Sequence, residues 1–252
     1  MNPLVIGSLV FVCVFGAGVL ALCLRLLIPR HHLGPATKDT VKLSMGLVAT
    51  MAALVLGLLV SSAKSSYDDQ KDEVTLMASN VAFMDQILAA YGPESAAARK
   101  SLRDGVEHMR DHLWPRAVTQ KPQTAPNAVS ADALYRAIAD LSPQNDEQRD
   151  LKAKVMSIAA EVGKTRFLLF TQTMGSSVSM PLLVVVVCWL AVLFFSFGLF
   201  APMNGIVINA LLAAALSVAG AIFLVLEFDH PFSGLIRISS QHVDNVLQLL
   251  GR

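Results

Sequence analysis

Residues 57–73 read GLLVSSAKSSYDDQKDE, and this stretch decides how the fold is built. An apolar run turns into a charged run here, with no proline or glycine at the join. Helical spacing continues from Gly46 through Tyr91, and no helix breaker follows Gly57 until Gly92 and Pro93. The sequence therefore predicts one helix that leaves an apolar environment and continues unbroken into a polar domain.

The composition is that of a membrane protein. Of the 252 residues, 54% are hydrophobic and only 15% are charged, whereas soluble domains carry roughly 25% charged residues. The uncharged sequence is concentrated in four apolar segments of about the length that spans a bilayer, at residues 3–28, 41–62, 178–200 and 206–228. The three cysteines lie inside these segments and form neither a disulfide framework nor a metal-binding spacing. The net charge of +1 does not indicate a nucleic-acid partner.

These segments predict an all-α protein with four transmembrane helices in the lipid bilayer and a helical-bundle extramembrane domain between the second and third spans. The expected parts are residues 1–62 with the first two spans, 63–177 with the bundle, 178–228 with the last two spans, and a tail over 229–252. We also expect a continuous helix over residues 146–200, with Gly175 and Pro181 as points where it would kink.

The bundle is predicted from apolar residues spaced three and four positions apart, the pattern of amphipathic helices. One stripe runs from Val74 to Tyr91, a second from Leu102 to Leu113, and a third from Leu151 to Leu169. Such stripes must pack on one another. A short further stripe follows in the tail, at Val243, Val246, Leu247 and Leu250. It could lie on the membrane or dock on the bundle, and docking or a subunit contact is slightly favoured.

The orientation in the membrane stays open from charge alone. Four spans place the N-terminus, the bundle and the C-terminus on one side, and Lys and Arg near span ends mark the cytoplasmic side. The two sides are almost equally basic, with Arg25, Arg30, Lys38 and Lys42 on one and Lys64, Lys71, Lys164, Arg166 and Arg237 on the other.

The second span carries a stripe of small and polar side chains along a helix that is otherwise Leu, Val and Met. Its members are Gly46, Thr50, Ala53, Gly57, Ser61 and Lys64. Small stripes let membrane helices approach one another closely, which is one interpretation. The other is the wall of a pore, where small and hydroxyl side chains leave room for water and ions.

Enzyme motifs are absent from the sequence: there is no phosphate-binding glycine loop, no Gly-x-Ser-x-Gly and no CxxC. His108 and His112 are four residues apart on a predicted helix, so both could face one metal ion. Met109 and Leu113 mark the buried face of that helix, which leaves the two histidines at its edge. A solvated face is the favoured interpretation, and we expect neither a metal nor another cofactor and no enzymatic activity.

Two stretches carry a resemblance to a known family. GLLVSSAKSSYDDQKDEVTLMASNV resembles the end of the second span of bestrophins, and LEFDHPFSG resembles the segment that follows their last span. The chain is more similar still to the bestrophin-like family of bacterial four-span membrane proteins over about residues 40–240. The shared features are the Trp114-Pro115 pair and a closing Asp-x-Pro-Phe-x-Gly motif, here Asp229, Pro231, Phe232 and Gly234.

The resemblance implies a homo-oligomer, a pentamer in that family, around a central pore lined by the second span. It places the bundle and both termini in the cytosol of a bacterial inner-membrane protein. The stripe from Gly46 to Lys64 would then line the pore, with Tyr67 and Asp68 at its inner mouth. Bestrophins narrow the pore with bulky apolar residues, whereas this chain has Ser62, Ala63 and Lys64 at the corresponding positions.

Two functional hypotheses follow. The first is a homo-oligomeric ion channel that conducts inorganic ions through a pore lined by the second span. The second is a non-conducting membrane scaffold or sensor that binds a cytosolic partner through its helical bundle. A membrane enzyme built on His108 and His112 is the least favoured hypothesis.

Overall fold

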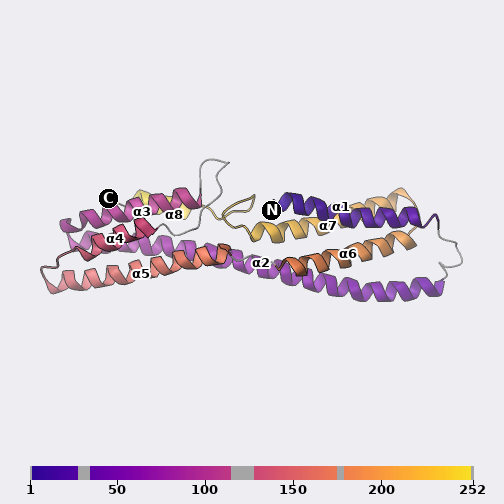
Figure 1. Cartoon of the computed structure of the whole chain (residues 1–252), viewed down its shortest axis with the longest axis horizontal. Coiled ribbons are helices and arrows are strands. Elements are labelled where there is room, and N and C mark those ends of the chain that lie inside the picture. Colours follow the sequence, from indigo (N-terminus) through magenta and orange to yellow (C-terminus); the bar gives the residue numbers. More distant parts are fainter. Residues whose placement is uncertain (1, 28–34, 115–127, 175–178, 251–252) are drawn as a thin grey trace. The chain divides into compact units, whose positions relative to one another are not determined.

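The computed structural model describes residues 2–27, 35–114, 128–174 and 179–250. The described part of the protein is 86% helical and contains no strand, so the predicted all-α class is confirmed. In chain order the elements in Figure 1 are α1 (Pro3–Leu24), α2 (Pro35–Tyr91), η2 (Pro93–Ser95), α3 (Ala96–Leu113), α4 (Ala128–Ala139), α5 (Asp146–Met174), α6 (Met180–Phe200), α7 (Gly205–Phe228) and α8 (Gln241–Leu249).

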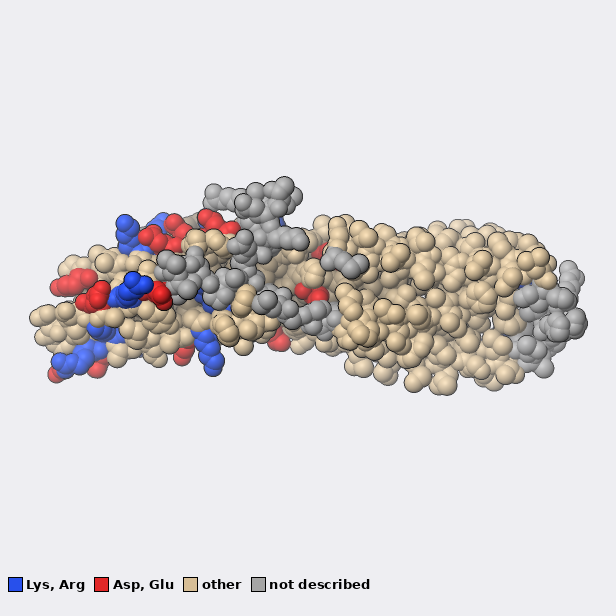
Figure 2. Space-filling view, viewed as in Figure 1, with Lys and Arg blue, Asp and Glu red and all other residues tan. Residues whose placement is uncertain are grey.

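The chain divides into two compact units, which we call the membrane unit (residues 1–66 and 177–229) and the bundle unit (67–176 and 230–252). Among the described residues, four helices are long and apolar enough to cross a membrane, namely α1, α2, α6 and α7. Figure 2 shows the matching contrast in charge: Lys, Arg, Asp and Glu gather over the bundle unit, and the visible face of the membrane unit is almost free of them.

The helix α2 belongs to both units. It extends over 57 residues from Pro35 to Tyr91, so the unbroken helix predicted from residues 57–73 is confirmed. It ends where Gly92 adopts a φ of 121°, a backbone conformation that glycine takes without steric penalty. Pro93 then opens the short η2 turn that leads into α3.

The continuous helix expected over residues 146–200 is wrong. The helix α5 ends at Met174 and α6 begins at Met180, after Ser179 in an extended conformation (φ −68°, ψ 106°). Pro181 lies in the first turn of α6, where its missing N–H would have no intrahelical partner in any case. This proline therefore starts a helix here, and it does not kink one.

In the membrane unit, α1 packs on both α6 and α7. At the crossing of α1 with α6, a Cβ added to Gly198 would overlap the carbonyl oxygen of Gly18, so the two backbones approach as closely as glycine permits. A buried apolar cluster joins these helices, and it includes Ala52, Leu59 and Ala63 from α2.

In the bundle unit, one apolar cluster holds α2, α3, α4, α5 and α8 together. The stripe predicted on α2 is its centre, since the six residues of that stripe are at most 3% exposed: Val74, Met77, Val81, Met84, Leu88 and Tyr91. The stripe of the C-terminal tail is buried in the same cluster, so the tail docks on the bundle, as favoured from the sequence.

Candidate functional site

The small and polar stripe of α2 lies on a face that the chain leaves uncovered. All six residues are exposed: Gly46, Thr50, Ala53, Gly57, Ser61 and Lys64. A Cβ added to Gly46 or Gly57 would meet no atom within 4 Å. The hydroxyl of Thr50 donates to the carbonyl oxygen of Gly46 at 2.9 Å, so this polar group is satisfied within its own helix. The stripe is therefore not needed for packing within the chain.

The rest of the membrane-spanning part of α2 has two other faces. Ala52, Leu59 and Ala63 are buried against the membrane unit, each at most 6% exposed. At about 100° per residue, their line lies roughly 140° around the helix from the stripe. Large apolar side chains occupy a third face, roughly 80° from the stripe, where Leu47, Leu54 and Leu58 are exposed. The helix thus has one packed face, one large apolar face and one small polar face.

At the charged end of the stripe, Lys64, Tyr67 and Asp68 have interactions with other residues of the chain. The ammonium group of Lys64 lies 5.9 Å from the centre of the Phe228 ring, a cation–π contact with the end of α7. Tyr67 is half-buried and packs against the apolar cluster of the bundle unit, and Asp68 is half-buried as well. The two residues expected at a pore mouth thus begin the bundle unit.

The closing motif after α7 builds a turn. Asp229 caps α7, with its N–H donating to the carbonyl of Val225. Gly234 has a φ of 92°, which is strained for any residue with a side chain. The turn is closed by the N–H of Ile238, which donates to the carbonyl of Pro231 at 2.8 Å. The motif glycine therefore has a local structural role.

The same turn is held by Trp114, from the other resemblance motif. The indole N–H of Trp114 donates to the carbonyl of Ile238 at 2.8 Å. Its ring lies edge-on to Phe232, with centroids 5.7 Å apart and an interplanar angle of 75°. Phe232 is 6% exposed and belongs to the bundle core. The two motifs thus form one structural element, while Pro115 lies outside the described residues.

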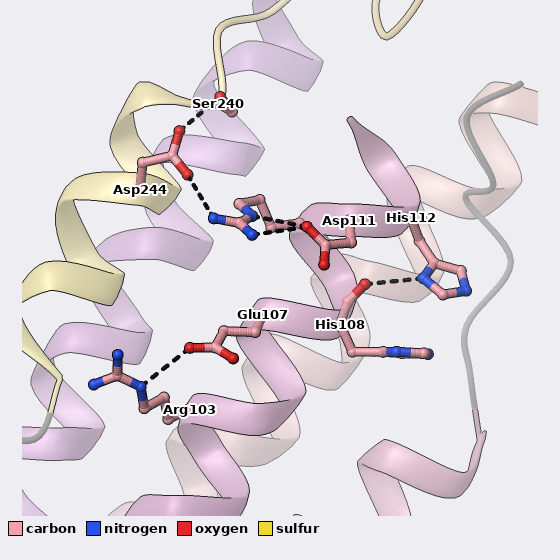
Figure 3. Close-up of polar contacts among 8 residues, drawn as sticks. Arg103, Glu107, His108, Asp111, His112, Ser240 and Asp244 are labelled. Atoms are coloured by element: carbon pink, nitrogen blue, oxygen red, sulfur yellow. Dashed lines mark hydrogen bonds and ion pairs between the residues drawn. The ribbon is translucent and has the colours of Figure 1, made fainter. Parts of the chain in front are cut away.

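Arginines on α3 fasten the C-terminal helix. Arg103 donates to the carbonyl of Leu250 at 2.8 Å, where α8 ends and its carbonyls lack intrahelical partners. Arg110 contacts Asp244 at 3.4 Å, and Asp244 in turn accepts a hydrogen bond from Ser240 (Figure 3). Sequence reasoning missed this clamp, although the seven-residue spacing of the two arginines places them on one helical face.

The two candidate metal ligands of α3 lie next to each other. The rings of His108 and His112 have centroids 4.1 Å apart, and Nδ1 of His112 is 2.9 Å from the carbonyl oxygen of His108. Figure 3 shows both imidazoles on the side of α3 that faces away from α8. Within the part of the chain that the structure describes, no third His, Cys, Asp or Glu completes a metal-binding group with them. The pair by itself is an incomplete ligand set.

A partly buried polar contact between α2 and α5 was also not predicted from the sequence. The amide Nε2 of Gln172 donates to Oε1 of Glu73 at 2.9 Å. Burial raises the pKa of the Glu73 carboxyl, the hydrogen bond from Gln172 opposes this, and the charge of Asp69 adds to the rise. The second carboxyl oxygen of Glu73 is buried and has no hydrogen-bond partner among the described residues.

Comparison with known proteins agrees with this architecture. No curated protein matches the chain. The sequence model of the Bestrophin-like domain matches residues 10–243, which is nearly the whole chain. The match includes most of the first span, the other three spans in full, the α2 stripe and both motifs around Trp114 and Phe232. The chain therefore belongs to the Bestrophin-like domain family.

Proposed function

We propose that the protein is a homo-oligomeric ion channel in which the membrane-spanning part of α2 lines a central pore. The observation that carries the proposal is the uncovered stripe from Gly46 to Lys64, opposite a face that is packed against the chain's own helices. A stripe that is not needed for packing within the chain is available to water, to lipid or to another copy of the protein.

The three faces of α2 match what a pore-lining helix requires. In a ring of copies, such a helix turns one face to the axis, one to its own subunit and one to the neighbouring copy. Glycine, alanine and hydroxyl side chains leave space for water and ions at the axis. The adjacent face with Leu47, Leu54 and Leu58 offers the apolar surface that contacts a neighbouring helix or lipid.

The finer points of the proposal rest on the family relationship. They are an assembly of five copies, a bacterial inner-membrane location with the bundle and both termini in the cytosol, and Lys64, Tyr67 and Asp68 near the inner mouth. The permeating species would be inorganic ions, and the protein would act without catalysis or a cofactor. The organisation into two pairs of spans, a bundle over residues 63–177 and a tail over 229–252 belongs to the same proposal.

The decisive experiment is to reconstitute the full-length protein in a planar bilayer and record current under asymmetric KCl. We expect discrete unitary currents, whose reversal potential gives the preference for cations or anions. Gly57→Trp, on the stripe, should abolish the current because an indole would fill the space at the axis. Val12→Trp places the same side chain at an exposed position of α1, a helix that does not line the proposed pore, and should leave conduction in place.

A second test maps the stripe by accessibility. A single cysteine at Ser61 should react with a charged thiol reagent from the aqueous side and block the current, whereas one at Leu58 should not. The background must lack Cys13, Cys23 and Cys188, since all three are exposed in the chain. The oligomer of each variant is checked by native mass spectrometry.

The competing function is a non-conducting scaffold or sensor that binds a cytosolic partner through the bundle. It is favoured if the verified oligomer stays silent at every voltage and Gly57→Trp breaks up the assembly, because the stripe would then be a packing surface between copies.

A further inference from the structure

The bundle unit contains a small cavity of about 60 Å³ between α2, α3, α4 and α5. Its walls are apolar side chains such as Val81, Val106 and Leu134, with glycines at two positions. Among the residues that line it, Tyr135 and Arg166 alone carry polar side chains. One buried water molecule needs about 10–15 Å³ of such a cavity, so this cavity has room for about four to six groups of the size of a water molecule.

Arg166 is the unusual member of this lining. Its guanidinium has no hydrogen bond and no ion pair with any residue in the described ranges, and the side chain is half-buried. Desolvation lowers its pKa, yet arginine keeps its proton in proteins, so the charge stays. Arg99, Arg103 and Arg110 of the same bundle each have a carboxylate partner. A partly desolvated charge without a partner is destabilising, and an anion beside it would reduce that penalty.

The other residues at the cavity leave room for an occupant. The hydroxyl of Tyr135 donates its proton to the carbonyl of Ala159 at 2.9 Å. Toward the cavity, the Tyr135 oxygen can therefore only accept a hydrogen bond. A Cβ on Gly105 would meet no atom within 4 Å, so α3 leaves its side of the cavity open. On the opposite wall, a Cβ on Gly163 would lie 3.1 Å from the Tyr135 hydroxyl, and that position has no such freedom.

From these features we infer that the cavity binds a short-chain monocarboxylate, with its carboxylate on Arg166 and its aliphatic tail among the apolar side chains. A guanidinium and a carboxylate form paired, charge-assisted hydrogen bonds. One cation matches one negative charge, whereas a phosphate dianion would bring an uncompensated charge into an apolar space. The volume suits a tail of about four to six carbon atoms. The site belongs to the bundle unit alone, so it stands or falls independently of ion conduction.

The test is binding to the purified full-length protein in lipid nanodiscs, by isothermal titration calorimetry and by the shift in unfolding temperature. Pentanoate and hexanoate should bind saturably and raise the unfolding temperature, because a ligand that binds only the folded state stabilises it. Hexan-1-ol, which has the tail without the charge, should bind at least about tenfold more weakly, the loss expected when a charge-assisted contact is missing. Phosphate, which has the charge without the tail, should also bind at least about tenfold more weakly, because it buries no apolar surface in the cavity.

Two variants separate the parts of the site. Arg166→Gln should weaken hexanoate binding about tenfold to a hundredfold, the range expected for losing hydrogen bonds to a charged group. Without ligand this variant should unfold at a temperature no lower than the wild type, because it removes an unpaired charge. Gly105→Leu keeps Arg166 and fills the cavity, so it should abolish binding of hexanoate, whereas the matched control Gly105→Ala should keep it.

The inference is overturned if hexanoate shows no saturable binding, or if Arg166→Gln and wild type bind it equally well. Equal binding of phosphate and hexanoate would also overturn it, because the site would then recognise a bare anion. Unchanged hexanoate binding in Gly105→Leu would overturn it as well. This variant tests the cavity even if Arg166→Gln does not fold.

Discussion

The indole of Trp114 donates its N–H to the carbonyl of Ile238 at the end of the turn that contains Phe232, and its ring lies edge-on to that phenylalanine. Two short motifs far apart in the sequence thereby become one contact that fastens the C-terminal segment to α3. The contact joins the residues that carry the family resemblance, and it assigns them a structural role in the bundle unit.

Trp114→Phe tests this contact. The substitution keeps an aromatic ring against Phe232 and removes the donor to Ile238, so the carbonyl loses a partner. We expect a loss of about 1–2 kcal/mol of stability and earlier proteolytic release of the C-terminal segment. Circular dichroism on heating and limited proteolysis measure the two effects. Trp189→Phe, in α6, is the matched control, and an equal effect of both substitutions would contradict the role of the Trp114 hydrogen bond.

Gly198→Ala tests the close crossing of α1 and α6. The new methyl group would overlap the carbonyl oxygen of Gly18 and crowd Ala21, so the helices must separate. We expect a destabilisation of about 1–3 kcal/mol, measured as a lower unfolding temperature in detergent. Gly220→Ala in α7 is the control, because its Cβ would meet nothing within 4 Å and alanine favours the helix. A tolerated alanine at Gly198 would show that the crossing does not need this glycine.

The ion pair between Asp85 of α2 and Arg99 of α3 is the third target. Arg99 binds both carboxylate oxygens, at 2.7 and 2.9 Å, and the two side chains are only 11% and 24% exposed. Asp85→Leu removes the carboxylate that binds both donors of this poorly hydrated guanidinium, and we expect it to cost about 2–4 kcal/mol. The double substitution Asp85→Leu/Arg99→Leu should cost less than the single one, as a double-mutant cycle of unfolding free energies would show. Strictly additive effects would mean that the pair is not coupled.

Glu73 gives a prediction about pH. Burial raises its carboxyl pKa in the folded protein, so the unfolded chain binds fewer protons in the pH range between the unfolded and folded values. The contribution of Glu73 to the free energy of unfolding therefore falls as the pH rises above the ordinary glutamate pKa and through that range. We expect Glu73→Gln to raise the unfolding temperature at neutral pH, and the gain to vanish below the ordinary pKa.

The control is Asp72→Asn, at the exposed neighbouring residue, which removes a carboxylate from the same turn of α2. Thermal unfolding of both variants and of the wild type is followed by circular dichroism across the acidic and neutral range. A stabilisation by Glu73→Gln that is equal at all pH values would contradict the explanation, because it would not depend on ionisation of the carboxyl.

The sequence by itself determined the four spans, the bundle stripes and the unbroken α2. These depend on local properties: the length of apolar runs, the three- and four-residue spacing, and the absence of proline and glycine between residues 58 and 91. The prediction failed for residues 146–200, because a proline can either kink a helix or start one. Pattern alone does not distinguish the two at Pro181.

Only the tertiary structure decided which residues far apart in the sequence meet. Periodicity identified the stripe from Gly46 to Lys64, but packing showed that the chain leaves this face uncovered while Ala52, Leu59 and Ala63 are buried. Similarly, the sequence identified Arg166 only as one basic residue near a span. The packing of four helices places it beside a cavity whose described lining contains no carboxylate. Contacts between helices depend on how their faces combine in three dimensions, and no single segment contains that information.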